Sequence, residues 1–242
     1  MLRCTILLWA VLFNVVYANA QRDSTFIKSE KKLIQQCSLP AALILSGILI
    51  SDSQFEKDFQ QDVNDRVGDD FNTSIDDYTR YVPIAQMYIA DVAGIASKNH
   101  WFDQTKNMAI SLLLTDLLTK RLKRGIYKER PNGFNAESFP SGHTSHAFTT
   151  ASVLYEEFKD TSPLLAYSGY GFATATGSLR VLKNKHWVSD VLLGAGIGVM
   201  ITKLVYHFDY LFQWNPFKES RHTVLLPNYT EGVAGVYFSV RF

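Results

Sequence analysis

Apolar residues along the chain fall into blocks of helical length, and sustained alternation of apolar and polar residues occurs only in the last twenty residues. The blocks cover residues 39–50, 81–96, 108–122, 161–179 and 188–206. Polar residues interrupt each block, so the blocks suit helices of a soluble core about as well as helices of a shallow membrane bundle. The pattern predicts an all-α fold, a bundle of about six helices.

The N-terminus has the pattern of an export signal. Arg3 precedes a mostly apolar run over residues 6–17, and the small residues Ala18 and Ala20 stand before Gln21. A first transmembrane helix would need a longer apolar run, of roughly 20 residues. We therefore predict a cleaved signal peptide over residues 1–20 and an exported protein that begins at Gln21.

The remainder divides into three segments. Residues 21–75 are predicted to form N-terminal helices and an acidic segment, residues 76–210 a core, and residues 211–242 a tail. The tail alternates on both sides of a turn-prone stretch, which predicts a short C-terminal β-hairpin. Residues 51–80 hold nine acidic side chains against three basic ones, a charge run typical of a solvated face.

Composition narrows the class of protein. The chain has 242 residues, of which 47% are hydrophobic, enough for a sizeable core in one domain. Without the leader and its single charge, Arg3, 23 basic residues balance 23 acidic ones, which excludes a nucleic-acid partner held by bulk charge. The only two cysteines, Cys4 and Cys37, exclude a disulfide scaffold and a multi-thiolate metal site.

Three polar stretches could together bind and attack a phosphate. Lys123, Arg130 and Arg180 offer positive charge and forked donors suited to a phosphate dianion. Ser141 and Gly142 follow a proline at a predicted helix start. The free backbone N–H groups of a helix start can bind an anion, and a glycine there lets the ligand come close to the backbone.

Two histidines complete this set. His143 lies at that helix start and can donate a proton to a leaving oxygen. His186 and Asp190 are four residues apart, so on a helix they share a face, and the carboxylate can orient the ring for nucleophilic attack. Each element alone is common by chance, but the three stretches in order are not.

The sequence here resembles the type 2 phosphatidic acid phosphatases, which share their core with vanadium haloperoxidases and bacterial acid phosphatases. The family pattern is Lys-x6-Arg-Pro, then Pro-Ser-Gly-His, then Ser-Arg-x5-His-x3-Asp. The chain matches it at Lys123, Arg130, Pro131, Pro140, Ser141, Gly142, His143, Arg180, His186 and Asp190. It departs at Leu179, where the family has Ser, although Ser178 stands one position earlier.

The resemblance extends more weakly over residues 76–206, where the chain looks most similar to bacterial envelope lipid phosphatases that include lipid A phosphatases. It implies a helical phosphatase core that needs no metal or other cofactor, a phosphohistidine intermediate on His186, and His143 as the acid. The implied substrate is a membrane lipid phosphate such as phosphatidate, phosphatidylglycerol phosphate, a polyprenyl diphosphate or lipid A. The expected location is the periplasmic side of the inner membrane, in association with it.

Three alternatives stay open at the level of the sequence. A mean hydropathy of −0.04 also suits a soluble, nonspecific periplasmic acid phosphatase. Vanadate, otherwise an inhibitor, would turn the same pocket into a haloperoxidase if it were bound at His186. A sensor with a decayed site is the third alternative, although almost every motif residue is present. The other histidines are scattered, so no metal site is predicted.

Overall fold

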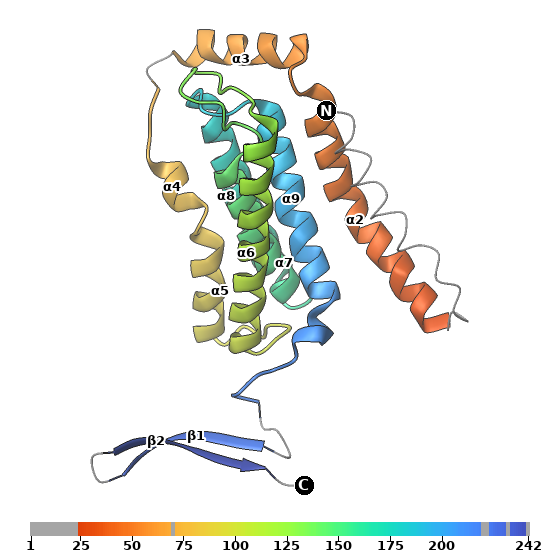
Figure 1. Ribbon diagram of the computed structural model, residues 1–242, viewed down its shortest axis with the longest axis vertical. Helices are drawn as coiled ribbons and strands as arrows, with labels where there is room; N and C mark the ends of the chain where they lie inside the picture. The colour runs from red at the N-terminus through yellow and green to blue at the C-terminus, as the bar shows by residue number, and fades with distance from the viewer. Residues whose placement is uncertain (1–23, 69–70, 219–222, 231–232, 241–242) are drawn as a thin grey trace. The chain divides into compact units, whose positions relative to one another are not determined.

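The computed structural model describes residues 24–68, 71–218, 223–230 and 233–240 (Figure 1). The predicted signal peptide lies outside these residues. The chain divides into two compact units, Met1–Gln36 and Cys37–Phe242. The predicted segment boundaries at residues 75 and 210 stay predictions.

Eight α-helices lie in the part of the chain that the structure describes, and the predicted all-α class is confirmed. They are α2 (Ser24–Ile50), α3 (Gln54–Val67), α4 (Ile75–Thr79), α5 (Val82–Val92), α6 (Trp101–Ile126), α7 (Gly142–Phe158), α8 (Pro163–Leu182) and α9 (Val188–His207). A short 3-10 helix follows at Asp209–Phe212. The strands β1 (Thr223–Thr230) and β2 (Val233–Val240) pair antiparallel, with Thr223 opposite Val240.

The predicted number of helices, about six, is too low. The two helices that the pattern missed, α3 and α4, both lie in the acidic segment. Ser53 caps α3 by accepting a hydrogen bond from the Glu56 backbone N–H at 3.2 Å, and Gly68, at φ 87°, ends it. The interpretation of the acidic segment as a solvated face is wrong for Glu56 and Asp76, which are both buried.

Helices α7 and α9 pack closely because glycines line their contact. A Cβ atom on Gly198 would lie 2.5 Å from the Ser145 carbonyl oxygen, and one on Gly194 would lie 2.8 Å from that of Ser141. Either contact would push the helices apart. The spacing of Gly194 and Gly198, four residues apart on α9, thus lets the two backbones approach closely.

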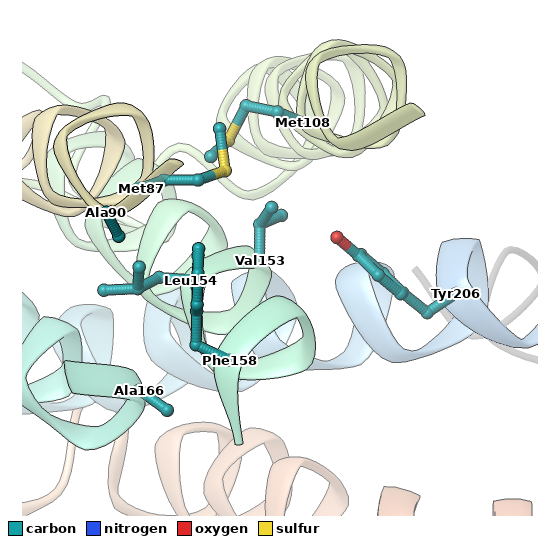
Figure 2. Packing of buried hydrophobic residues seen from close by; sticks show 8 residues of the cluster. All are labelled: Met87, Ala90, Met108, Val153, Leu154, Phe158, Ala166 and Tyr206. Carbon is teal, nitrogen blue, oxygen red and sulfur yellow. The ribbon is translucent and has the colours of Figure 1, made fainter. Parts of the chain in front are cut away.

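A hydrophobic cluster lies toward the C-terminal end of α7 (Figure 2). Its members come from α5 to α9 and are Met87, Ala90, Met108, Val153, Leu154, Phe158, Ala166 and Tyr206. Met87, Leu154 and Phe158 are fully buried, and each contributes about 2 kcal/mol of burial free energy. The other end of α7, about 24 Å away at 1.5 Å per residue, carries Ser141, Gly142 and His143.

Apolar side chains are also exposed in rows. Leu113, Leu114, Leu117 and Leu118 lie on the outer face of α6 and are 40–58% exposed. Two helical stretches, Leu33–Ile50 and Val188–His207, are long and apolar enough to cross a membrane; the first is mostly exposed and the second mostly buried. Length and composition alone make this weak evidence, since a buried core helix meets the same criterion.

Candidate active site

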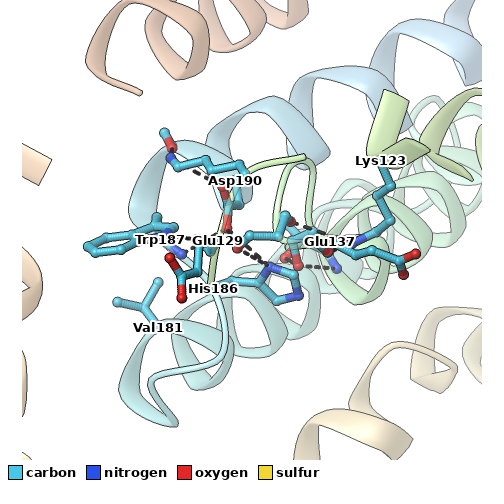
Figure 3. A network of polar contacts seen from close by, with 12 residues as sticks. Lys123, Glu129, Glu137, Val181, His186, Trp187 and Asp190 are labelled. Atoms are coloured by element: carbon cyan, nitrogen blue, oxygen red, sulfur yellow. Dashed lines mark hydrogen bonds and ion pairs between the residues drawn. The ribbon is translucent and has the colours of Figure 1, made fainter. Parts of the chain in front are cut away.

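The three motifs meet where helix ends converge. Lys123 lies in the last turn of α6, Ser141 caps the N-terminus of α7, and Arg180 lies in the last turn of α8. His186 belongs to the loop between α8 and α9, and Asp190 to the first turn of α9. Figure 3 shows Lys123, His186 and Asp190 in one polar network. Residues far apart in the sequence thus surround one site.

His186 is held by Asp190, but not across a helical face as the spacing predicts. The ring precedes α9, and its Nδ1 lies 3.1 Å from Asp190 Oδ2. The same oxygen accepts hydrogen bonds from the Trp187 backbone N–H, at 2.9 Å, and from the Ser138 hydroxyl. Asp190 therefore caps its own helix and orients the histidine with one carboxylate oxygen.

The geometry leaves His186 Nε2 free to act as a nucleophile. A proton on Nδ1 is directed at the carboxylate, so the lone pair lies on Nε2. Only 1% of the residue is exposed, and burial lowers the pKa of His186 to about 4, against the opposing effect of Asp190. The ring is thus neutral, and able to attack, at neutral pH.

The N-terminus of α7 supplies an anion site. Ser141 Oγ accepts hydrogen bonds from the Thr144 hydroxyl at 2.9 Å and from its backbone N–H at 3.5 Å. The Ser141 backbone N–H donates to the Asp190 carbonyl oxygen at 3.0 Å, which ties the start of α7 to α9. At Gly142 a Cβ atom would meet nothing closer than 3.9 Å, so there is room for a ligand at the helix start.

The three predicted cations lie close enough to influence one another. Burial, together with the charges of Arg130 and Arg180, lowers the pKa of Lys123 to about 8. Arg180 is only 5% exposed and donates from Nη1 to Asp76 Oδ2 at 2.7 Å. The Nε–H groups of Arg130 and Arg180 are buried and have no hydrogen-bond partner. Two buried donors are thus available for an acceptor such as a phosphate oxygen.

His143 has a carboxylate partner that its motif does not contain. Its Nε2 lies 2.7 Å from Oδ1 of Asp77 on α4. Asp77 comes from a segment 66 residues away in the sequence, so this partner cannot be read from the motif. Burial and the charge of Arg180 nevertheless lower the pKa of His143 to about 4, and Asp77 opposes both effects.

The sequence model of the PAP2 superfamily matches residues 98–214, which contain all three motifs. Over these residues the chain therefore matches the PAP2 superfamily. It is 33% identical over 147 residues to lipid A 1-phosphatase of Porphyromonas gingivalis, and the match covers 60% of this chain. The chain spans about a third of the length of that relative, of which 33% is covered.

A solved PAP2 structure shares the fold. It is the crystal structure of a transmembrane PAP2-type phosphatidylglycerolphosphate phosphatase from Bacillus subtilis, with a TM-score of 0.53 and 19% identity. The likeness covers 72% of this chain and 98% of that one. The helical arrangement around the motifs is therefore that of a known PAP2 protein.

Several residues outside the PAP2 motifs complete the site. Asp76 accepts a hydrogen bond from Arg180 through Oδ2 and one from Lys183 Nζ, at 2.7 Å, through Oδ1. Lys183 is buried, although lysines in such a loop are usually exposed. The other additions are Glu56, Asp77, Lys128 and Ser138. For Asp76, Asp77, Lys128 and Ser138 the one sequence signal was the weaker resemblance over residues 76–206, and Glu56 lies outside that range.

Among the residues that the structure describes, one cluster could hold a metal ion. Asp76, Asp77 and His143 offer ligand atoms within 4.8 Å of one another. Both oxygens of Asp76 already accept from Arg180 and Lys183, and His143 Nε2 contacts Asp77. These atoms are better explained as part of a charge network than as ligands, and the absence of a catalytic metal stays a prediction.

Proposed function

We propose that this chain is a metal-independent phosphatase that hydrolyses a phosphate monoester of a membrane lipid. The observation that carries the proposal is the pair of buried, unpartnered Nε–H groups on Arg130 and Arg180, beside a neutral, carboxylate-oriented His186. Forked cationic donors bind the phosphate, and the histidine attacks it. The similarity to lipid A 1-phosphatase supports a lipid phosphate as substrate.

The reaction has two steps. In the first, His186 Nε2 forms a bond to phosphorus while the bond to the leaving oxygen breaks, and His143 gives that oxygen a proton. In the second, His143 removes a proton from water, the hydroxide attacks phosphorus, and the phosphorus–nitrogen bond breaks to release inorganic phosphate. Lys123, Arg130 and Arg180 stabilise the charge that builds up on the equatorial oxygens in both steps.

Protonation of His143 depends on the bound substrate. A pKa of about 4 leaves the ring mostly neutral at pH 7. A phosphate dianion beside Arg180 offsets the positive charge that lowers this pKa, so substrate binding favours the protonated acid. The same offset stabilises Lys123 in its charged form.

Membrane association rests on the exposed apolar side chains. The leucine row of α6 and the exposed face of α2 would lie against lipid tails, since a soluble surface rarely exposes apolar side chains in such rows. Together with the predicted leader, this supports action on the periplasmic side of the inner membrane. A substrate in the same membrane is then within reach of the site.

Phosphate release from a panel of lipids tests the proposal. We expect purified protein in detergent, with a chelator present, to hydrolyse at least one of phosphatidate, phosphatidylglycerol phosphate, a polyprenyl diphosphate and lipid A. Orthovanadate, which mimics the five-coordinate transition state, should inhibit competitively. Activity that the chelator abolishes and magnesium restores would contradict metal independence. Extraction by buffer alone, with hydrolysis of soluble esters only, would favour the nonspecific acid phosphatase instead.

Replacing Asp77 with asparagine should impair proton donation. Without the carboxylate, the pKa of His143 falls further, because Asp77 stabilises the charged ring. The acid form is then lost at lower pH, so the alkaline limb of kcat should move to lower pH. We expect about a tenfold loss of kcat at neutral pH on an alkyl phosphate, measured by phosphate release.

The leaving group provides the internal comparison for Asp77→Asn. p-Nitrophenolate leaves without a proton, so kcat on p-nitrophenyl phosphate should change little. Asp65→Asn, on the exposed side of α3, is the matched control and should leave both substrates unaffected. Equal losses on both substrates would show that Asp77 does not act through the acid.

A further inference from the structure

Lys128 is a buried cation outside the PAP2 motifs. It lies in the loop after α6 and is 6% exposed. Its Nζ donates to Ser51 Oγ at 3.0 Å, Glu56 Oε2 at 2.8 Å and Ser189 Oγ at 2.7 Å. All three ammonium hydrogens thus have acceptors, which fix the position of the charge.

That charge lies against the carboxylate that orients the nucleophile. Lys128 Nζ is 3.5 Å from Asp190 Oδ1, a buried oxygen with no hydrogen-bond partner. The other oxygen, Oδ2, receives the hydrogen bonds from Ser138, Trp187 and His186. A buried carboxylate needs compensation at both oxygens. Hydrogen bonds stabilise the negative charge at Oδ2, and the positive charge of Lys128 stabilises it at Oδ1.

Glu56 holds Lys128 in this place and also holds the loop that carries the nucleophile. Its Oε1 accepts from the Ser189 backbone N–H at 3.2 Å. One turn further along α3, Gln60 donates to the Val181 carbonyl oxygen at 3.2 Å and to Asn184 Oδ1 at 3.0 Å. Polar side chains of α3 thus form hydrogen bonds at both ends of the loop that carries His186.

We propose that Lys128, held by Glu56, is a positioning residue that fixes Asp190 and keeps His186 neutral and correctly oriented for attack. This role rests on the proposed function, in which His186 is the nucleophile. The charged groups that influence the ring are Asp190, Arg180 and Lys123, with Lys128 and Glu56 behind the carboxylate. A cation there disfavours a second positive charge on the ring, and Glu56 partly offsets it.

Three variants test this role through the sign of a pH shift. Lys128→Met removes the cation, so the pKa of His186 should rise and the acid limb of kcat/KM should move to higher pH by about one unit. Glu56→Gln removes the opposing charge and should move the same limb to lower pH. The kcat of Lys128→Met should fall about tenfold, because Asp190 is held less firmly. The measurement is the pH profile on p-nitrophenyl phosphate, together with the rate of phosphohistidine formation.

The double variant Lys128→Met/Glu56→Gln separates positioning from folding. Lys128→Met alone leaves Glu56 buried without its partner and so destabilises the fold. In the double variant Glu56 no longer leaves an unpaired charge, although Asp190 Oδ1 still lacks its compensating cation. The double variant should therefore recover most of the melting temperature that Lys128→Met loses, while it keeps the reduced kcat and a shift to higher pH. Lys120→Met, which removes an exposed lysine on α6, is the control and should change neither.

Two outcomes would overturn the role of Lys128. Wild-type kcat and pH profile in the double variant would make Lys128 a folding residue only. Shifts of the same sign in Lys128→Met and Glu56→Gln would show that charge is not the cause. Both outcomes require active wild-type protein, whereas a wild-type chain that hydrolyses no phosphate ester would contradict the proposed function itself.

Discussion

Replacing His186 with alanine is expected to abolish turnover, with a loss of at least about 10⁴-fold in kcat. The ring is the one group in the site that is buried, neutral at pH 7 and oriented by a carboxylate, with Nε2 left free. Without it, no covalent intermediate can form. The cationic pocket remains, so the variant should still bind orthovanadate or a product phosphate.

The intermediate itself gives the most direct measurement. Rapid quenching of the wild type at alkaline pH, with labelled substrate, should trap a phosphoramidate that is stable to base and labile to acid, on the peptide that contains His186. His186→Ala should show no label. His207→Ala, at the far end of α9, is the matched control and should label normally. A label on His143, or substantial turnover by His186→Ala, would reverse the assigned roles.

Replacing Arg180 with lysine is expected to lower kcat/KM about 100-fold or more, although the charge is kept. Arg180 uses Nη1 to bind Asp76 and still has a buried Nε–H without a partner. A lysine can donate to Asp76 or to the phosphate. Its single ammonium group cannot do both at once, because it lacks the separate donors that the planar guanidinium directs at two partners. Arg130→Lys should behave similarly, because its Nε–H is also buried and unpartnered.

Kinetics and inhibition together identify the cause of this loss. The orthovanadate inhibition constant should rise with the loss in kcat/KM, since both report binding of the transition-state charge. Arg124→Lys, an exposed position one residue after Lys123, is the matched control and should leave both values unchanged. Wild-type kinetics in Arg180→Lys and Arg130→Lys would mean that these arginines do not bind phosphate.

The motif residues could be predicted because their chemistry is local. Close spacing places His186 near Asp190 and puts Ser141 at a helix start, whichever way the remaining chain folds. Contacts between distant segments could not be predicted in this way. Asp77 contacts His143 across 66 positions, and Glu56 contacts Ser189 across 133.

Burial of charge was the feature that the sequence pattern could not reveal. Asp76 and Asp77 are adjacent in the sequence, yet the side chain of Asp76 is fully buried and that of Asp77 is 49% exposed. A run of acidic residues has the same composition whether its members meet water or a buried cation. Only the positions of Arg180, Lys183 and Lys128 decide between these two environments.

The glycine contact between α7 and α9 fixes one part of the site, the two helix ends, and leaves another part, the loop between α6 and α7, free to vary. Gly194 packs beneath Ser141, and Ser141 donates its N–H to the Asp190 carbonyl, so the spacing of the two catalytic helix ends is set by the bundle. The loop between α6 and α7 carries exposed side chains such as Tyr127 and Phe134. Its exposed outer positions can accept substitutions without moving the proposed reacting groups, which gives natural variation a way to change what the site binds while the proposed chemistry is retained.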